Sequence, residues 1–166
     1  TADGNYCLTC GGNIKLWNPI KGLLLQTYSG HGYDVLDAQG SHDSSKIASG
    51  AMDRSVLLSD VSTAQVVRRF RGHASHVNCV KFNQESTVIL SGSVDGTLKA
   101  WDCKSQSRDA IQIFDEAKDS VTSVAVSSYE ILTGSLDCKL RRYDLRKGFM
   151  YCDDIKSNKI LLNNCL

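Results

Sequence analysis

The chain has 166 residues, of which 42% are hydrophobic and 22% are charged, a composition that excludes an intrinsically disordered protein. Its 19 Lys and Arg residues nearly balance 18 Asp and Glu residues, so the formal charge of +1 gives no net field that attracts nucleic acid or an anionic membrane. The longest apolar stretches, such as residues 160–162, are too short to cross a bilayer.

Cysteine usage bears on metal chemistry and on the cellular compartment. Among the seven cysteines, Cys7 and Cys10 form the single C-x-x-C pair. We expect this segment to be a strand, in which residues three apart point to opposite faces and cannot hold one metal ion. We therefore predict no metal site and no cofactor. Residues 1–5 are polar, unlike a secretory signal, so we expect free thiols in a reducing compartment.

The sequence repeats itself with a step of 42 residues, and such a fixed period indicates a repeat architecture. Four similar segments end in Asn or Asp. The residues immediately before that end are 42 residues apart: Trp17, Ser59, Trp101 and Tyr143. The marks that keep the same step upstream are Ser49, Ser91 and Thr133, each before a glycine, the turn residues Asp53, Asp95 and Asp137, and two Gly-His pairs at 30–31 and 72–73.

Short alternating segments bounded by turn residues predict four β-strands in each repeat. In the third repeat they are expected at 77–83, 88–94, 98–102 and 110–116. Four strands per 42 residues is a propeller blade, so we predict an all-β, incomplete propeller of about three and a half four-stranded blades. The units expected in chain order are a partial first blade at 1–30, which enters at its second strand, blades at 31–72, 73–116 and 117–155, the last with a strand at 149–155, and a non-repeat tail at 156–166.

The Gly-His opening, the Ser-Gly pair, the turn Asp and the Trp-Asp ending resemble the WD-repeat family over residues 6 to about 148. The chain is also similar to the mitogen-activated protein kinase organizer family, through the segments at 3–10, 28–33, 70–74, 87–93 and 141–146.

The WD-repeat resemblance implies a structural tetrad in which the turn Asp binds the His, the His binds the Ser, and the Ser binds the Trp indole. The matching residues are His31, Ser49 and Asp53 in the second blade, His73, Ser91, Asp95 and Trp101 in the third, and Thr133, Asp137 and Tyr143 in the fourth. Only the third set is complete, because Ser59 replaces Trp, residues 116–117 replace Gly-His, and the first unit lacks the turn Asp. Loss of a buried Trp costs about 3–5 kcal/mol unless neighbours repack.

Recurring His, Ser and Asp residues also suggest a hydrolase. A nucleophilic serine needs an exposed position, an oxyanion hole and a single copy, whereas these residues recur from blade to blade as packing residues do. We therefore expect no catalytic residues and no enzyme activity. The alternative is a propeller enzyme with its site over the central channel, which needs polar groups that converge in a closed ring.

About three and a half blades are fewer than the four to eight that close a propeller, and an open arc exposes apolar faces and strand edges. We therefore expect a fragment or a truncated isoform whose tail replaces the remaining blades. A second alternative for the function follows, which is a decoy or non-functional piece that occupies partners without completing the scaffold.

Propellers bind partners through the loops at the rim of the central channel. The rim residues that we expect to contact partners are Tyr33, Arg54, His76 and Lys118. Basic residues cluster at 68–71 and 139–147, but no aromatic platform accompanies them. We therefore expect no direct nucleic-acid binding and no membrane partner.

The resemblance to the organizer family implies a non-catalytic scaffold for protein–protein interactions in two settings. One is the assembly of kinases of the extracellular-signal-regulated cascade, and the other is association with the spliceosome in pre-mRNA splicing. The expected partners are kinase-cascade components and spliceosomal proteins, and the expected location is both cytoplasmic and nuclear.

Overall fold

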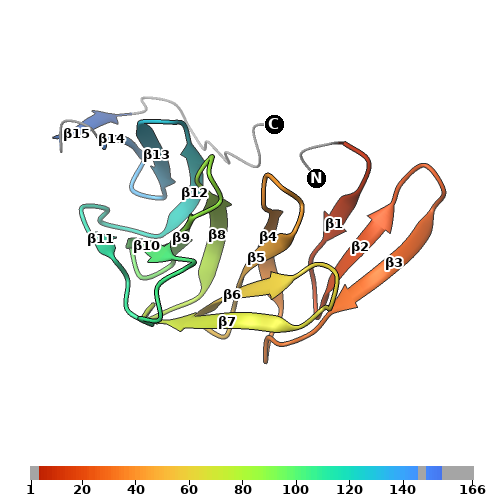
Figure 1. The fold of residues 1–166 in the computed structure, drawn as a ribbon. Helices are drawn as coiled ribbons and strands as arrows, with labels where there is room; N and C mark the ends of the chain where they lie inside the picture. The colour runs from red at the N-terminus through yellow and green to blue at the C-terminus, as the bar shows by residue number, and fades with distance from the viewer. Residues whose placement is uncertain (1–3, 146–148, 155–166) are drawn as a thin grey trace.

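The computed structural model describes residues 4–145 and 149–154, and within these ranges every regular element is a β-strand. The strands form four antiparallel sheets that follow one another in chain order around an arc (Figure 1). The predicted all-β, incomplete propeller is therefore confirmed. Residue 155 of the expected last strand and the expected tail at 156–166 lie outside the described residues. In the described part of the chain, no helix is long and apolar enough to span a membrane.

Each sheet is built from strands that are consecutive in the sequence. The first contains β1 (Cys7–Thr9), β2 (Ile14–Asn18) and β3 (Leu23–Tyr28). The second contains β4 (Val35–Gly40), β5 (Lys46–Ala51), β6 (Ser55–Asp60) and β7 (Val66–Arg71). The third contains β8 (Val77–Phe82), β9 (Val88–Ser93), β10 (Leu98–Asp102) and β11 (Gln112–Phe114). The fourth contains β12 (Val121–Val126), β13 (Glu130–Ser135), β14 (Lys139–Asp144) and β15 (Phe149–Asp154).

The third repeat shows where sequence and structure agree. Strands β8, β9 and β10 lie within one residue of the expected ranges, whereas β11 is shorter than the expected 110–116. It is shorter because residues 103–111 form a long loop, which returns to the sheet when the Ile111 amide donates to the Ala100 carbonyl at 2.9 Å.

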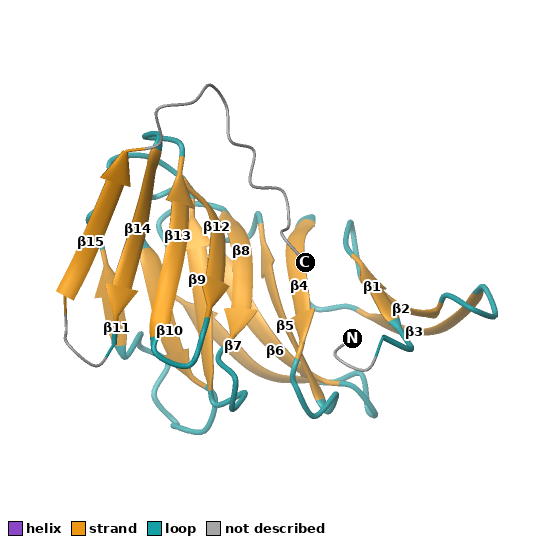
Figure 2. Ribbon diagram, turned by 90° about the horizontal axis from the view of Figure 1, so that it is seen from above, coloured by secondary structure: helices purple, strands orange, loops and turns teal. Residues whose placement is uncertain are grey.

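Strands β4, β8 and β12 lie side by side along the inner side of the arc (Figure 2). Polar side chains on one inner strand reach the backbone of the next. The Val80 amide donates to Asp37 Oδ2 at 2.9 Å, and the Phe82 amide donates to Gln39 Oε1 at 2.8 Å. Asn78 Nδ2 donates to the Val121 carbonyl at 2.9 Å. These bonds hold neighbouring sheets at a fixed spacing. Burial of the Asp37 carboxyl between the sheets raises its pKa above the ordinary value.

The hydrophobic core is divided into three clusters, each shared by two neighbouring sheets. The cluster between the first and second sheets contains Ile14, Leu16, Tyr28, Val35, Ile47 and Ala51. The cluster between the second and third sheets contains Ala48, Val56, Leu58, Phe70, Val77, Val80, Phe82, Ile89, Trp101 and Cys103. The cluster between the third and fourth sheets contains Cys79, Leu90, Leu98, Ala100, Phe114, Val121, Val124, Ile131 and Tyr143. Each inner sheet therefore buries both of its faces, which explains the nearly continuous burial of β5, β6 and β9.

Two glycines mark the closest approach between sheets. A Cβ built on Gly50 would lie 2.5 Å from Val77 Cγ1, and one built on Gly92 would lie 2.6 Å from Val121 Cγ1. Both distances are shorter than real Cβ contacts, so the Ser-Gly pair of the repeat is required by inter-sheet packing.

We expect Gly92→Ala to destabilise the fold by about 1–3 kcal/mol, because the added methyl group pushes the third and fourth sheets apart. Urea unfolding followed by far-UV circular dichroism measures the change. Gly40→Ala is the matched control, since a Cβ at this strand residue meets no atom within 4 Å. Equal stability of the Gly92→Ala variant and the control variant would contradict the packing role.

Candidate functional site

The third blade holds an unbroken chain of side-chain hydrogen bonds. His73 Nδ1 lies 3.0 Å from Asp95 Oδ2, and His73 Nε2 lies 2.8 Å from Ser91 Oγ. Trp101 Nε1 donates to the same Ser91 oxygen at 2.8 Å. The Ala74 amide also donates to Asp95 Oδ2 at 2.8 Å. The network ties the loop before β8 to the β9–β10 hairpin, and it places the four residues in the roles that the resemblance implied.

In the second blade the same network lacks its indole. His31 Nδ1 lies 3.0 Å from Asp53 Oδ2, and His31 Nε2 lies 2.8 Å from Ser49 Oγ. Arg69 adds hydrogen bonds to Asp53 Oδ2 at 3.4 Å and to the Gly30 carbonyl. Ser59, which stands in register with Trp101, is only 3% exposed.

The cluster between the first and second sheets contains a tyrosine instead of a tryptophan. Tyr28, one repeat before Phe70, is 2% exposed, and its hydroxyl donates to the Val61 carbonyl at 3.0 Å. Val61 and Ala64 pack against the same cluster as Tyr28. A cavity of about 280 Å³ remains between the first and second sheets, and its lining includes Leu16, Ile47 and Val61.

The fourth blade replaces the histidine with an ion pair. The Lys118 amide donates to Asp137 Oδ2 at 3.0 Å, as the Ala74 amide does to Asp95, so Ala117 occupies the histidine position. Arg141 binds the Asp137 carboxylate with both guanidinium nitrogens, at 3.2 and 2.5 Å. This contact holds the pKa of Asp137 well below its ordinary value.

The tryptophan and serine positions of the fourth blade hold a tyrosine and a threonine. The Tyr143 hydroxyl, in place of the indole, donates to Glu116 Oε2 at 3.0 Å. Burial raises the pKa of Tyr143, and so does the Glu116 carboxylate. Thr133, which stands at the serine position, is 2% exposed. The fourth blade thus lacks both the histidine and the tryptophan, but the Asp137 carboxylate still accepts hydrogen bonds from the Lys118 amide and from Arg141.

The first blade keeps the hydrogen bond between the indole and a hydroxyl group, although a constant step of 42 residues does not identify the residue that carries the hydroxyl. Trp17 Nε1 donates to Thr9 Oγ1 at 3.0 Å. Thr9 pairs with Lys15 across the β1–β2 hairpin, as Ser91 pairs with Lys99 across β9–β10. The hairpin is two residues shorter, so a strict step of 42 points to Cys7 instead of Thr9. Allowing a shortened turn in the alignment would have found it.

Burial and hydrogen bonding set the protonation of the network. Burial lowers the pKa of His31 and of His73, although the adjacent carboxylates favour the charged imidazole. Hydrogen bonds from hydroxyl and amide groups lower the pKa of Asp53 and Asp95 to about 2, although burial opposes this shift. The neutral imidazole then donates from Nδ1 to the carboxylate and accepts the serine hydroxyl at Nε2. Ser49 and Ser91 are 0% exposed, so neither hydroxyl can reach a substrate from solvent.

The C-x-x-C pair does not lie within one strand. Strand β1 ends at Thr9, so Cys10 lies in the following turn, and both Cys7 and Cys10 are free and exposed. Partial burial and Asp37 raise the pKa of Cys10 to about 11, which favours the thiol over the metal-binding thiolate. In the described part of the chain, no group of three or more His, Cys, Asp or Glu side chains could hold a metal ion.

The loop rim presents one apolar residue at the same turn position in three of the four blades. Met52, Val94 and Leu136 are 37%, 44% and 58% exposed, and each precedes a turn Asp. Their amides donate to the carbonyls of Asp34, His76 and Ser120 at 2.9–3.0 Å, which binds each turn to the loop before the first strand of its blade.

The four rim residues that the sequence suggested as partner contacts are all exposed. Tyr33 is 69% exposed and lies in the loop before β4. Arg54 has a φ of 63° in the β5–β6 turn, where the next repeat has Gly96 with a φ of 79°. His76 and Lys118 lie in the loops before β8 and β12. Their contact with partners stays a prediction.

The repeating four-stranded sheets and the His–Ser–Asp network define the chain as a WD-repeat protein. Residues 22–60 and 64–102 match the WD domain, G-beta repeat, each segment running from the last strand of one sheet to the third strand of the next. Over 157 residues the chain is 59% identical to WD repeat domain-containing protein 83 of Xenopus tropicalis and 58% identical to that of Homo sapiens.

Both alignments cover 93% of this chain and 50% of the relative. The WD repeat domain-containing protein 83 homolog of Dictyostelium discoideum is 32% identical over 178 residues, covering 89% of this chain and 54% of the relative. The chain thus spans about half the length of the curated relatives it matches.

Acidification is expected to weaken the fold first through His31 and His73. Their folded-state pKa lies below the ordinary value of 6.5, so the unfolded chain takes up protons first as the pH falls through about 6.5. Urea unfolding should therefore show lower stability at about pH 5.5 than at about pH 7.5. The variant His42→Gln/His76→Gln, altered only at exposed histidines, should show the same loss. Stability that is unchanged or higher at the lower pH would contradict the buried neutral state.

Proposed function

We propose that the chain is a non-catalytic scaffold that binds partner proteins through the loop rim. The observation that carries this proposal is the exposed apolar residue at the same turn position of three successive blades: Met52, Val94 and Leu136. Tyr33 and Arg54 lie on neighbouring rim loops and belong to the residue types that dominate protein interfaces. A row of such side chains on fixed turns provides anchors without a large ordering cost.

The proposal extends to the partners. The resemblance to the organizer family supports components of the extracellular-signal-regulated kinase cascade and spliceosomal proteins as the bound proteins. A scaffold with partners in both settings works in the cytoplasm and in the nucleus, and the proposal includes both locations. The similarity to WD repeat domain-containing protein 83 over 93% of the chain supports this assignment. The buried serines, which lie out of reach of a substrate, support a non-catalytic role.

Capture from cell extract on the immobilised, folded chain tests the rim. We expect kinases of the cascade or spliceosomal proteins to be enriched. The variant Met52→Asp/Val94→Asp/Leu136→Asp should lower their recovery by at least about tenfold, because three apolar side chains that the partner would cover become charged. The control is Ile20→Asp/Leu23→Asp/Ile113→Asp, which adds the same charge at exposed apolar residues away from the rim. Recovery of neither protein group, or equal losses in both variants, would reject the rim as the binding face.

Fractionation of cells that express the tagged chain tests the location. We expect the chain in both the cytoplasmic and the nuclear fraction, since the two proposed groups of partners differ in compartment. If the chain is found in one fraction alone, the proposed partners that belong to the other compartment are excluded.

A further inference from the structure

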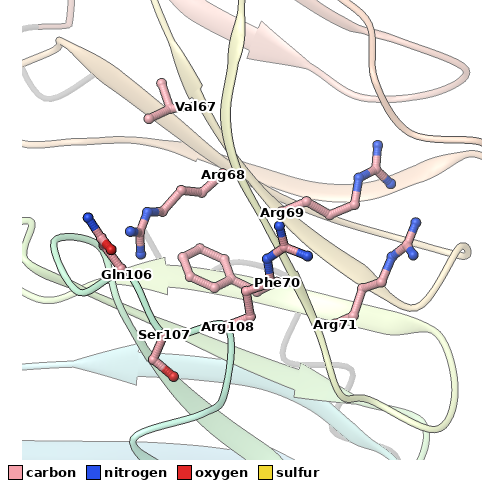
Figure 3. A pocket seen from close by; sticks show the side chains of 8 residues that line it. All are labelled: Val67, Arg68, Arg69, Phe70, Arg71, Gln106, Ser107 and Arg108. Carbon is pink, nitrogen blue, oxygen red and sulfur yellow. The ribbon is translucent and has the colours of Figure 1, made fainter.

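A basic groove lies along β7, the outer edge strand of the second sheet. It is a cavity of about 600 Å³ lined by residues 67–71 of β7 and residues 106–108 of the β10–β11 loop. The lining contains four arginines and no acidic residue: Arg68, Arg69, Arg71 and Arg108. In Figure 3 the Arg108 side chain lies beside Phe70, with Arg68 on one side and Arg71 on the other. The groove therefore concentrates positive charge on a protein that is nearly neutral overall.

The four arginines differ in how far the protein already satisfies them. Arg69 is held by Asp53, Ser55 and the Gly30 carbonyl, so it belongs to the second-blade network. Arg68 makes one long hydrogen bond, 3.5 Å from Nη1 to the Asp102 carbonyl. Arg71 and Arg108 are exposed, and among the described residues their guanidinium groups have no hydrogen-bond or ion-pair partner. Arg71 and Arg108 are thus the two lining arginines available to an external anion, whereas Arg68 lies near Asp102 and helps to lower the pKa of the Asp102 carboxyl.

The groove exists because the third repeat departs from the period of the other repeats. The segment between Trp101 and Glu116 is two residues longer than the segment between Ser59 and Gly72. The extra length forms the long β10–β11 loop, where the Ser107 amide donates to Ser105 Oγ at 3.1 Å and the Asp109 amide donates to Ser107 Oγ at 3.1 Å. These local bonds brace the loop and set Arg108 opposite β7.

The edge of β7 adds main-chain groups to the same surface. Strand β7 is the last strand of its sheet and pairs only with β6. Five consecutive β7 residues line the groove, although their side chains alternate between the two faces of the sheet. The groove therefore opens onto the strand edge, where unpaired amides and carbonyls can bind an extended peptide.

We propose that this groove docks an extended peptide segment that carries a phosphorylated serine or threonine, with Arg71 and Arg108 beside the phosphate. A phosphate carries nearly two negative charges and three acceptor oxygens, which match several guanidinium groups at once. The groove lacks the exposed aromatic side chains on which single-stranded nucleic acid stacks, since Phe70 is only 2% exposed. Its volume suits one phosphorylated residue with its neighbours. The site is separate from the rim and does not depend on the rim proposal.

Fluorescence anisotropy with the full chain tests the site. The probes are a labelled pool of short peptides with a fixed central phosphoserine, the same pool with serine, and a labelled single-stranded RNA of mixed sequence. We expect the phosphorylated pool to bind at least about tenfold more tightly than the unphosphorylated pool, because only phosphate engages the free guanidinium groups.

Three double variants distinguish this groove from general surface charge. Arg71→Ala/Arg108→Ala should weaken binding of the phosphorylated pool by at least about tenfold, and Arg71→Lys/Arg108→Lys should restore it only in part, because lysine lacks the bidentate fork. Lys15→Ala/Lys21→Ala, with the same change in charge on the first sheet, should bind as the unaltered chain does. Circular dichroism checks that each variant is folded.

Equal binding of the two peptide pools, or absence of binding, would overturn the proposal. So would an equal loss of binding in Arg71→Ala/Arg108→Ala and in the control Lys15→Ala/Lys21→Ala. Tighter binding of the RNA that is lost in Arg71→Ala/Arg108→Ala would also overturn it and would assign the groove to nucleic acid. Because these variants leave the rim unchanged, failure here does not bear on the rim proposal.

Discussion

Face-to-face packing of successive sheets is the constraint on which the rest of the structure depends. A single four-stranded sheet has two apolar faces and cannot bury either alone, so each blade needs a neighbour on both sides. The close approach at Gly50 and Gly92 leaves no room for a side chain on the central strand. With that spacing fixed, the inner strands come within hydrogen-bonding reach of each other, as Asp37 and Gln39 show. The arc and the order of its sheets follow from this stacking.

The polar network holds the loop before the first strand of a blade to the rest of that blade. Its variation from blade to blade shows which of its bonds the fold requires. What persists in blades two to four is a turn aspartate that accepts the amide of the loop before the first strand: Asp53, Asp95 and Asp137. The cation or imidazole beside that carboxylate can change, because a buried carboxylate needs hydrogen bonds and not one particular donor. The indole can also change, since Ser59 stands in its place in the second blade and Tyr143 in the fourth, and both of these residues are buried.

The 42-residue period and the alternating segments were sufficient to predict the strands of the third repeat and the incomplete propeller, whereas the third-blade network was implied by the resemblance to the WD-repeat family. The period succeeded because residues one period apart meet the same packing environment, as Ile47, Ile89 and Ile131 do in three successive clusters. It failed where the chain gains or loses residues. The short β1–β2 hairpin concealed Thr9, and the paired change to Arg141 and Ala117 depends on contacts between segments distant in sequence. The groove could not be predicted from the sequence either, because only the fold brings Arg108 close to β7.

Repetition also separates structural residues from residues free to serve function. A residue that recurs in every blade is explained by packing, so specific binding has to come from positions that differ between blades. Tyr33 at the rim and Arg108 in the lengthened loop are two such positions. The β9–β10 turn of the rim and the β10–β11 loop of the groove lie at opposite ends of β10. Two peptides or proteins bound at these places would be held at a fixed separation, which raises the effective concentration of one near the other without any contact between the sites.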